Sequence, residues 1–143
     1  MKRPEIKTLQ NLEAAFAGES MAHIKYRYFA KIARAAGDEA TARVFEETAE
    51  QEVAHAFGHL DLLYPKAGMT PAKCLEIAIA GETYEYTEMY PTFRKTAEAE
   101  GHGAAVREID EQIAESKEHA EAFKATLEKA AKRFAALANR YSK

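Results

Sequence analysis

The segment from residue 80 to residue 91 decides the fold, because its opening repeats an earlier part of the chain. It reads Ala80-Gly81-Glu82-Thr83-Tyr84-Glu85-Tyr86-Thr87-Glu88-Met89-Tyr90-Pro91. Its first four residues match Ala17-Gly18-Glu19-Ser20, which lie 63 positions earlier (80 − 17). Beyond Pro91, which looks like a one-residue insertion, the offset is 64, and His119-Ala120 then matches His55-Ala56. We therefore predict two helical hairpins of common origin, related by a pseudo-twofold axis.

Apolar residues recur at helical spacing through both halves, and glycine and proline interrupt them at only a few places. The expected helices run from about Ile6 to Gly37, from Asp38 to Tyr64-Pro65, from Thr70-Pro71 to about Glu100, and from Gly103 through Phe134 and Leu137, with a basic end after about Ala130 that frays or packs elsewhere. Pro91 should kink the third helix near Tyr90, since it removes one backbone hydrogen bond. The predicted fold class is all-α, a four-helix bundle in a single domain over residues 1–143.

The composition excludes several classes of protein. Hydrophobic residues make up 47% of the chain and charged residues 30%, which excludes a disordered segment, and no apolar run is long enough to cross a membrane. A net charge of −3 offers no basic face for nucleic acid and no polybasic patch for a membrane surface. The single cysteine, Cys74, excludes an intrachain disulfide and a Cys-x-x-Cys metal site. No secretory signal is expected at the start, so a cytoplasmic location is the default expectation.

The residues that carry chemistry are carboxylates and histidines at matched places in the repeat. Glu52 and His55 are three residues apart, so in a helix both side chains project to one side. Glu19 and Glu82 follow small residues that let helices approach closely, and His119 repeats His55. One glutamate from each of two helices plus Glu-x-x-His from each of the other two is the pattern of di-iron carboxylate bundles. Oxygen and imidazole ligands suit iron or manganese, and zinc can occupy such a site.

One position departs from this pattern. The repeat partner of Glu52 is Ser116, whose hydroxyl is a poor ligand for Fe(II). Glu115 lies four residues before His119, on nearly the same helix face, and we interpret it as a replacement ligand. Glu85 adds a second acid beside Glu82, and a buried pair of like charges is costly without a cation. The metal-free protein should therefore be looser than the metal-loaded protein.

The plainer interpretations of these residues stay open. A lone Glu-x-x-His on a helix is usually a solvated pair, and Glu85 alone would be a surface acid; the joint occurrence on four helices favours a metal site. His59 is interpreted as structural or as a residue that supports a ligand. His23 and His102 are interpreted as surface residues, and the tyrosines as aromatic residues of the core or its rim.

Three stretches make the chain resemble the rubrerythrin family over roughly residues 8–128. They are residues 11–20, Asn-Leu-Glu-Ala-Ala-Phe-Ala-Gly-Glu-Ser; residues 49–56, Ala-Glu-Gln-Glu-Val-Ala-His-Ala; and residues 80–91, quoted above. The chain looks like the short, sulerythrin-type form, which lacks the C-terminal rubredoxin domain with its four iron-binding cysteines. The resemblance implies a ferritin-like bundle with a di-iron site and peroxide-reducing activity.

The resemblance also implies roles for single residues. It makes Glu19 and Glu82 terminal ligands, Glu52 a bridge between the metals, Glu85 a carboxylate that exchanges with His55 as one iron changes oxidation state, and His119 the ligand of the second hairpin. It implies that Tyr26 and Tyr90 hydrogen-bond ligand carboxylates. The family has Glu at the position of Ser116, so the second bridge is in question. Short members tend to form homodimers, some by exchanging helices between chains, with the connection between hairpins as the hinge.

The expected function is a di-iron, non-haem peroxidase that reduces hydrogen peroxide to water in defence against oxidative stress. Its catalytic residues would be Glu52, His55 and Glu85, and its electrons would come from a separate donor such as a rubredoxin-like protein. Two irons are expected, with Fe–Zn or manganese as alternatives. A ferroxidase or oxygen-activating di-iron protein, a non-enzymatic zinc- or iron-binding bundle, and a helical interaction module without metal remain as alternatives.

Overall fold

The computed structural model describes residues 7–142, and every element in that part of the chain is helical. The all-α prediction is therefore confirmed. The chain divides into two compact units, Met1–Gly68 and Met69–Lys143, each built around one helical hairpin. No helix among the described residues combines the length and the apolar composition needed to cross a membrane.

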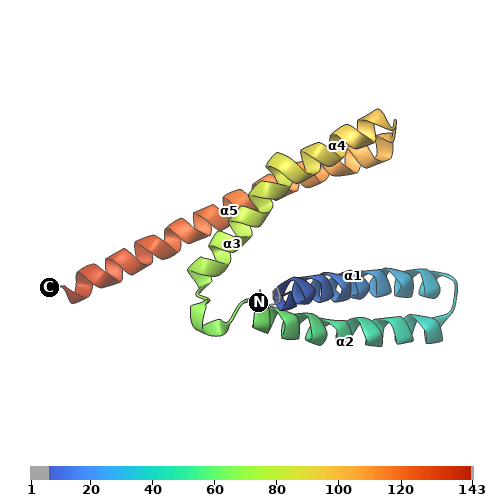
Figure 1. The fold of residues 1–143 in the computed structure, drawn as a ribbon, viewed down its shortest axis with the longest axis horizontal. Helices are drawn as coiled ribbons and strands as arrows, with labels where there is room; N and C mark the ends of the chain where they lie inside the picture. Colours follow the sequence, from blue (N-terminus) through green and yellow to red (C-terminus); the bar gives the residue numbers. More distant parts are fainter. Residues whose placement is uncertain (1–6, 143) are drawn as a thin grey trace, which may run out of the picture. The chain divides into compact units, whose positions relative to one another are not determined.

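The first unit is a hairpin of α1 (Thr8–Ala35) and α2 (Glu39–Leu63), which run side by side in Figure 1. Gly37 has a positive φ of 83°, a conformation that glycine adopts without steric cost, and it ends the turn after α1. The side chain of Asp38 then accepts a hydrogen bond from the backbone N–H of Thr41, which caps α2 as the sequence predicts. A short single turn, η1 (Lys66–Gly68), follows α2.

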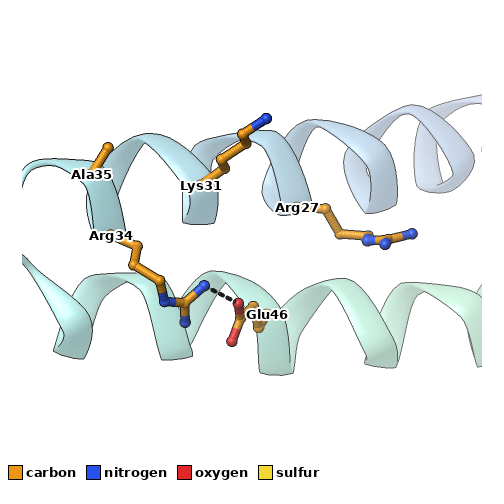
Figure 2. A pocket seen from close by; sticks show the side chains of 5 residues that line it. All are labelled: Arg27, Lys31, Arg34, Ala35 and Glu46. Carbon is orange, nitrogen blue, oxygen red and sulfur yellow. Dashed lines mark hydrogen bonds and ion pairs between the residues drawn. The ribbon is translucent and has the colours of Figure 1, made fainter.

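Small residues hold α1 against α2. The buried apolar residues of this unit are all alanines, Ala30, Ala42, Ala49 and Ala56. Near the loop, Arg34 of α1 pairs with two acids: its Nε lies 2.9 Å from Glu39 Oε2, and its Nη1 lies 2.6 Å from Glu46 Oε1 (Figure 2). Hydrogen bonds from Arg34 hold the pKa values of the Glu39 and Glu46 carboxyls below their usual range.

The second unit consists of α3 (Pro71–Tyr84), η2 (Glu85–Met89), α4 (Tyr90–Ala99) and α5 (Gly103–Tyr141), with α5 packed along the other three. Thr70 caps α3 by accepting a hydrogen bond from Lys73 N at 3.1 Å, and proline follows at the first helical position. Its buried residues are Ala97, Ser116 and Ala120. Arg94 of α4 binds Asp110 of α5 through Nε at 2.6 Å, which ties the two helices near their loop.

The third predicted helix is interrupted by a π-helical turn, η2, in place of a simple kink at Tyr90. Across this turn the backbone N–H of Tyr90 donates to the carbonyl of Glu85, five residues earlier. A π-helical turn takes up one extra residue, so it accounts for the change of repeat offset from 63 to 64. The widened turn comes directly before Pro91, whose ring would otherwise clash with the preceding turn of a regular helix.

The fourth predicted helix, with Phe134 and Leu137 on its apolar stripe, is confirmed as α5. Its basic end was expected to fray or pack elsewhere after about Ala130, but α5 continues as a regular helix to Tyr141. An apolar stripe at alternating steps of three and four residues, Ala120, Phe123, Leu127, Ala130, Phe134, Leu137 and Tyr141, continues along it. The periodic pattern therefore extends the helix past the basic residues, although its members are exposed from Ala130 onward.

Candidate metal centre

The first unit brings three predicted ligands together. Glu19 comes from α1, and Glu52 and His55 come from one face of α2. His55 Nδ1 lies 3.5 Å from Glu19 Oε1 and 3.8 Å from Glu52 Oε1. One ligand atom from each residue lies within 4.8 Å of the other two, which is compact enough to surround a single metal ion. The two carboxylates are half-buried and the imidazole is exposed, so the open side of the cluster is at His55.

His59 also lies in this cluster, although the spacing of the predicted ligands alone did not place it there. Its Nε2 lies 2.7 Å from Glu19 Oε2, one helical turn beyond His55. Glu19 Oε2 is buried and accepts no hydrogen bond of normal geometry from the described residues, so the two side chains are in close contact without the alignment of a regular hydrogen bond. His59 therefore supports Glu19, which agrees with its interpretation as a structural or supporting residue.

The second unit repeats part of this arrangement. His119 Nδ1 lies 3.4 Å from Glu82 Oε1, which matches the His55–Glu19 pair of the first unit. Ser116 is 4% exposed, and its hydroxyl donates a hydrogen bond to Glu85 Oε2 at 3.3 Å. Glu115 is exposed on α5, as His119 is, and its role as a replacement ligand stays a prediction.

Two buried carboxylate oxygens test whether this set of residues fits a metal. Glu19 Oε2 and Glu82 Oε2 are both buried without a regular hydrogen bond from any described residue. Buried acceptors without a regular hydrogen bond are costly, and a cation bound beside each glutamate would satisfy its buried oxygen. Each orphaned oxygen belongs to a glutamate that faces an imidazole, and mixed carboxylate and imidazole donors suit iron, manganese or zinc. The residues present therefore fit a metal site, and the fit does not select among these metals.

The two predicted tyrosines lie in aromatic contacts. The Tyr26 ring lies 5.8 Å from the Phe45 ring, between α1 and α2. The Tyr90 ring meets Phe93 edge to face at 6.3 Å. Burial, and then the charges of Glu85 and Glu82, raise the pKa of Tyr90 above its usual value. The Tyr90 hydroxyl is therefore protonated at neutral pH, and its pKa depends on the carboxylates of its unit. The hydrogen bonds from Tyr26 and Tyr90 to ligand carboxylates stay predictions.

The remaining histidines have structural partners. His23 was interpreted as a surface residue, but it is half-buried, and its Nδ1 lies 2.7 Å from the carbonyl oxygen of Ala49 on α2. The Nδ1 of His102 accepts a hydrogen bond from the backbone N–H of Ala105 and caps α5. Neither role could be predicted from the position of the histidine in the sequence, because both roles depend on which backbone groups lie near its ring.

The hollows on the first unit differ in character. One is lined by Arg27, Lys31, Arg34, Ala35 and Glu46, close to the α1–α2 loop, and its Arg34 is already paired with Glu46 (Figure 2). A second hollow contains Glu52 among mostly apolar residues, including Phe16, Ile24 and Phe57. An apolar setting strengthens the electrostatic interactions of a carboxylate, so the second hollow is the chemically relevant one.

These features define an all-α protein with repeated carboxylate–histidine pairs that fit a metal, and the comparisons identify its family. The rubrerythrin family model matches residues 10–66 and 62–127. Rubrerythrin of Porphyromonas gingivalis is 44% identical over 107 residues, which is 66% of this chain and 53% of that protein. Nigerythrin of Nitratidesulfovibrio vulgaris is 38% identical over 128 residues, which is 81% of this chain and 63% of that protein. The chain belongs to the rubrerythrin family.

Family membership confirms the predicted resemblance and the predicted ferritin-like, all-α class. Proteins of this family bind a di-iron centre and are generally oxidoreductases. A solved structure of nigerythrin in its fully reduced, all-ferrous state aligns with a TM-score of 0.43 at 35% identity, over 89% of this chain and 69% of that chain. The chain spans 53% and 63% of the length of the two relatives described above, so activity and partners are taken up as proposals.

Proposed function

We propose that this protein is a di-iron, non-haem peroxidase that reduces hydrogen peroxide to water. The observation that carries the proposal is the repeated pair of a half-buried glutamate and an exposed imidazole, Glu19 with His55 and Glu82 with His119. Each pair leaves one buried carboxylate oxygen without a regular hydrogen bond from the described residues. Membership in a family of di-iron oxidoreductases supports iron as the metal.

The chain's residues have separable tasks in this proposal. Glu19, Glu52, Glu82 and Glu85 would hold two cations, and His55 and His119 would complete the ligand set. Two Fe(II) ions, when bound, supply one electron each, which matches the two-electron reduction of hydrogen peroxide to water. His55 is 57% exposed on its side chain, so peroxide can approach on this side. The raised pKa of Tyr90 keeps its hydroxyl protonated, so that it can donate a hydrogen bond close to the carboxylates.

The partners belong to the same proposal. Re-reduction requires an electron donor, and the relationship to rubrerythrins supports a separate rubredoxin-like protein. We retain a homodimer and a cytoplasmic location as expectations from the sequence. A second candidate function, a metal-binding protein without peroxidase activity, is favoured by one observation: the buried residue at the repeat position of Glu52 is Ser116, which adds no charge. A ferroxidase would share the ligands and differ only in its oxidant.

An anaerobic titration tests the proposal. The metal-free protein is loaded with Fe(II), its iron content is measured, and hydrogen peroxide is added while absorbance is followed. We expect two irons per chain, oxidation by one equivalent of peroxide for each iron pair, and slower oxidation by dioxygen. Faster oxidation by dioxygen would favour the ferroxidase, and bound iron that peroxide does not oxidise would favour the non-enzymatic protein.

Glu52→Ala is the matched variant for this titration. It removes a half-buried ligand without altering the rest of the α1–α2 hairpin, and we expect tight iron binding to be lost. Circular dichroism of the metal-free variant checks that it remains helical. Retention of two irons per chain in this variant would contradict the ligand assignment.

A further inference from the structure

We propose that Ser116 is a positioning residue of the metal centre, whose buried hydroxyl holds one oxygen of Glu85 and leaves the other oxygen, Oε1, to bind metal. The inference deepens the proposed function and rests on it for one premise, that Glu85 is a metal ligand. It states which oxygen of this carboxylate serves as the ligand and which residue selects that oxygen. Ser116 itself contributes neither charge nor a ligand atom.

Ser116 differs from all the other buried residues in the part of the chain that the structure describes. It is 4% exposed, and the others are alanines. An alanine would fill the same place in α5, so what the serine adds is its hydroxyl. A buried hydroxyl is costly without a hydrogen-bond partner, so the partner that it takes indicates what it does.

The hydroxyl of Ser116 reaches across to a neighbouring element. It donates a hydrogen bond to Glu85 Oε2 at 3.3 Å, from α5 to η2. A hydroxyl on a helix has a closer choice, the backbone carbonyl four residues earlier. Thr126, further along α5, takes that choice and donates to the carbonyl oxygen of Ala122 at 2.9 Å. Ser116 therefore joins two elements where a helical hydroxyl commonly bonds within its own helix.

The contact lies on the face of α5 that carries a predicted ligand. One turn beyond Ser116, His119 Nδ1 lies 3.4 Å from Glu82 Oε1. Glu85 follows Glu82 by three residues, so the two contacts are on successive turns of α5. Ser116 also occupies the repeat position of Glu52. An ionised glutamate there could only accept hydrogen bonds, whereas the serine hydroxyl can donate one to a carboxylate.

The hydrogen bond occupies one oxygen of Glu85 and leaves the other available. Among residues 7–142 no second hydrogen bond or ion pair reaches this carboxylate. A hydrogen bond to an ionised carboxylate is stronger than one between neutral groups. A metal that binds Oε1 alone retains this bond, whereas a metal that takes both oxygens has to displace it. Ser116 therefore favours a Glu85 that binds metal through a single oxygen.

Infrared spectroscopy of the metal-free, full-length protein tests the contact itself. Ser116→Ala removes the donor, and we expect the stretching bands of one carboxylate to shift because that carboxylate loses a hydrogen bond. Introducing Ser116→Ala into a Glu85→Ala background should produce no such shift, because the acceptor is already absent. Thr126→Ala is the matched control, since it removes an exposed hydroxyl that bonds only within α5.

Co(II) tests the consequence for the metal. The metal-free protein is loaded anaerobically with Co(II), whose visible absorbance per ion falls as oxygen ligands are added and the geometry approaches an octahedron. In Ser116→Ala both oxygens of Glu85 are free to bind, so we expect a loss of absorbance per bound Co(II) at equal metal content. The loss should be absent from Thr126→Ala, and adding Ser116→Ala to Glu85→Ala should cause no further change.

Three results would overturn the inference. They are a Ser116→Ala protein whose carboxylate bands do not shift, one whose Co(II) spectrum is unchanged, and effects of Ser116→Ala that persist in the Glu85→Ala background. Circular dichroism checks folding, and alanine suits this position because alanines fill the other buried positions described.

The same measurements separate the inference from the proposed function. Unchanged spectra in Ser116→Ala, with an iron pair that peroxide still oxidises in the unaltered protein, would overturn only the role of Ser116. Spectral changes that depend on Glu85, in a protein whose iron peroxide does not oxidise, would support the role of Ser116 and overturn only the peroxidase.

Discussion

The pKa of Tyr90 in the second unit depends on a few single carboxylate side chains near it. Burial is the first cause of the raised pKa of Tyr90, and the charge of Glu85 is the next, followed by Glu82 and Glu108. The phenol therefore reports the ionic state of the neighbouring carboxylates. A divalent cation bound there would offset their charge and lower the pKa of Tyr90.

We predict that Glu85→Gln lowers the pKa of Tyr90 in the metal-free protein, because one nearby negative charge is removed. Ultraviolet titration of tyrosinate measures it, and Tyr90→Phe in the same background isolates this residue from the other six tyrosines. Glu88→Gln is the control, because Glu88 is exposed and does not contribute to the shift. An identical tyrosinate titration in Glu85→Gln and in the unaltered protein would contradict the interpretation.

The sequence was informative about ligands to the extent that they follow the repeat. Glu19 matches Glu82, His55 matches His119, and Glu52 lies three residues before His55, so the repeat together with helical spacing predicts their grouping within a hairpin. The contact of His59 with Glu19 and the bond from Ser116 to Glu85 could not be predicted, because each joins two helices whose relative register no pattern in a single helix fixes. The exposure of Glu115 likewise depends on the rotation of α5 about its axis.

Within each hairpin, an arginine near the loop ties one helix to the other. Arg34 binds Glu46 in the first unit, and Arg94 binds Asp110 in the second. Glu46 and Asp110 are repeat partners at the offset of 64, whereas the two arginines are not. The acid thus occupies the same repeat position in both units, whereas the arginine that binds it comes from a different turn of the opposing helix in each unit. A search of the sequence for arginines at matching repeat positions would therefore not find these two contacts.

We predict that the second unit loses stability in acid, because the Arg94–Asp110 contact is lost when the Asp110 carboxylate is protonated. The hydrogen bond from Arg94 lowers the pKa of the Asp110 carboxyl from its ordinary value of 3.8. A lowered pKa in the folded state means that the contribution is present above the unfolded pKa and is lost as pH falls through the folded pKa. Thermal unfolding followed by circular dichroism from neutral to strongly acid pH measures it.

Asp110→Asn should lower the unfolding midpoint near neutral pH and converge with the unaltered protein in strong acid. Glu111→Gln, at the exposed neighbouring position, should change neither the midpoint nor its pH dependence appreciably. Parallel curves for Asp110→Asn and the unaltered protein across the whole range would show that the contact contributes nothing through protonation.

At the level of elements, periodicity predicted the helices and missed two of their features. The four helices and their loops follow from the apolar spacing, the caps at Asp38 and Thr70, and the glycines. The apolar stripe predicted α5 as far as Leu137, but fraying was expected after about Ala130 because the end of the helix is basic, and the structure keeps this end helical. The π-helical turn had a signal, the change of repeat offset, but that change was assigned to Pro91 rather than to the turn before it.

At the scale of the whole molecule, buried acids without partners make stability depend on metal. The orphaned oxygens of Glu19 and Glu82 destabilise the metal-free fold, and a ligand that binds only the folded chain shifts the unfolding equilibrium. We predict that Fe(II) at about 100 times its dissociation constant raises the free energy of unfolding by about 2.7 kcal/mol for each ion that binds only the folded chain. Anaerobic urea unfolding with and without Fe(II) measures it.

Glu52→Ala should lose most of this stabilisation, because its first unit no longer has a complete cluster. Magnesium at the same concentration serves as the control ion, since it prefers oxygen ligands and retains its water. Equal stability with and without Fe(II) would mean that the buried carboxylates are satisfied in some other way. The stabilisation should also shrink in acid, where protons compete with the metal for its ligands.

The π-helical turn lets the second hairpin carry one residue more than the first without changing the phase of its turns. α1 is a continuous α-helix without such a turn, yet Glu19 lies against His55 as Glu82 lies against His119, so the widened turn absorbs the extra residue locally. Loss of one residue from 86–89 should let the backbone close into an ordinary α-helix like α1, with Glu82 still on the side of His119. Alignments of related chains should therefore open a one-residue gap in this segment, because the residues on both sides of the gap still correspond.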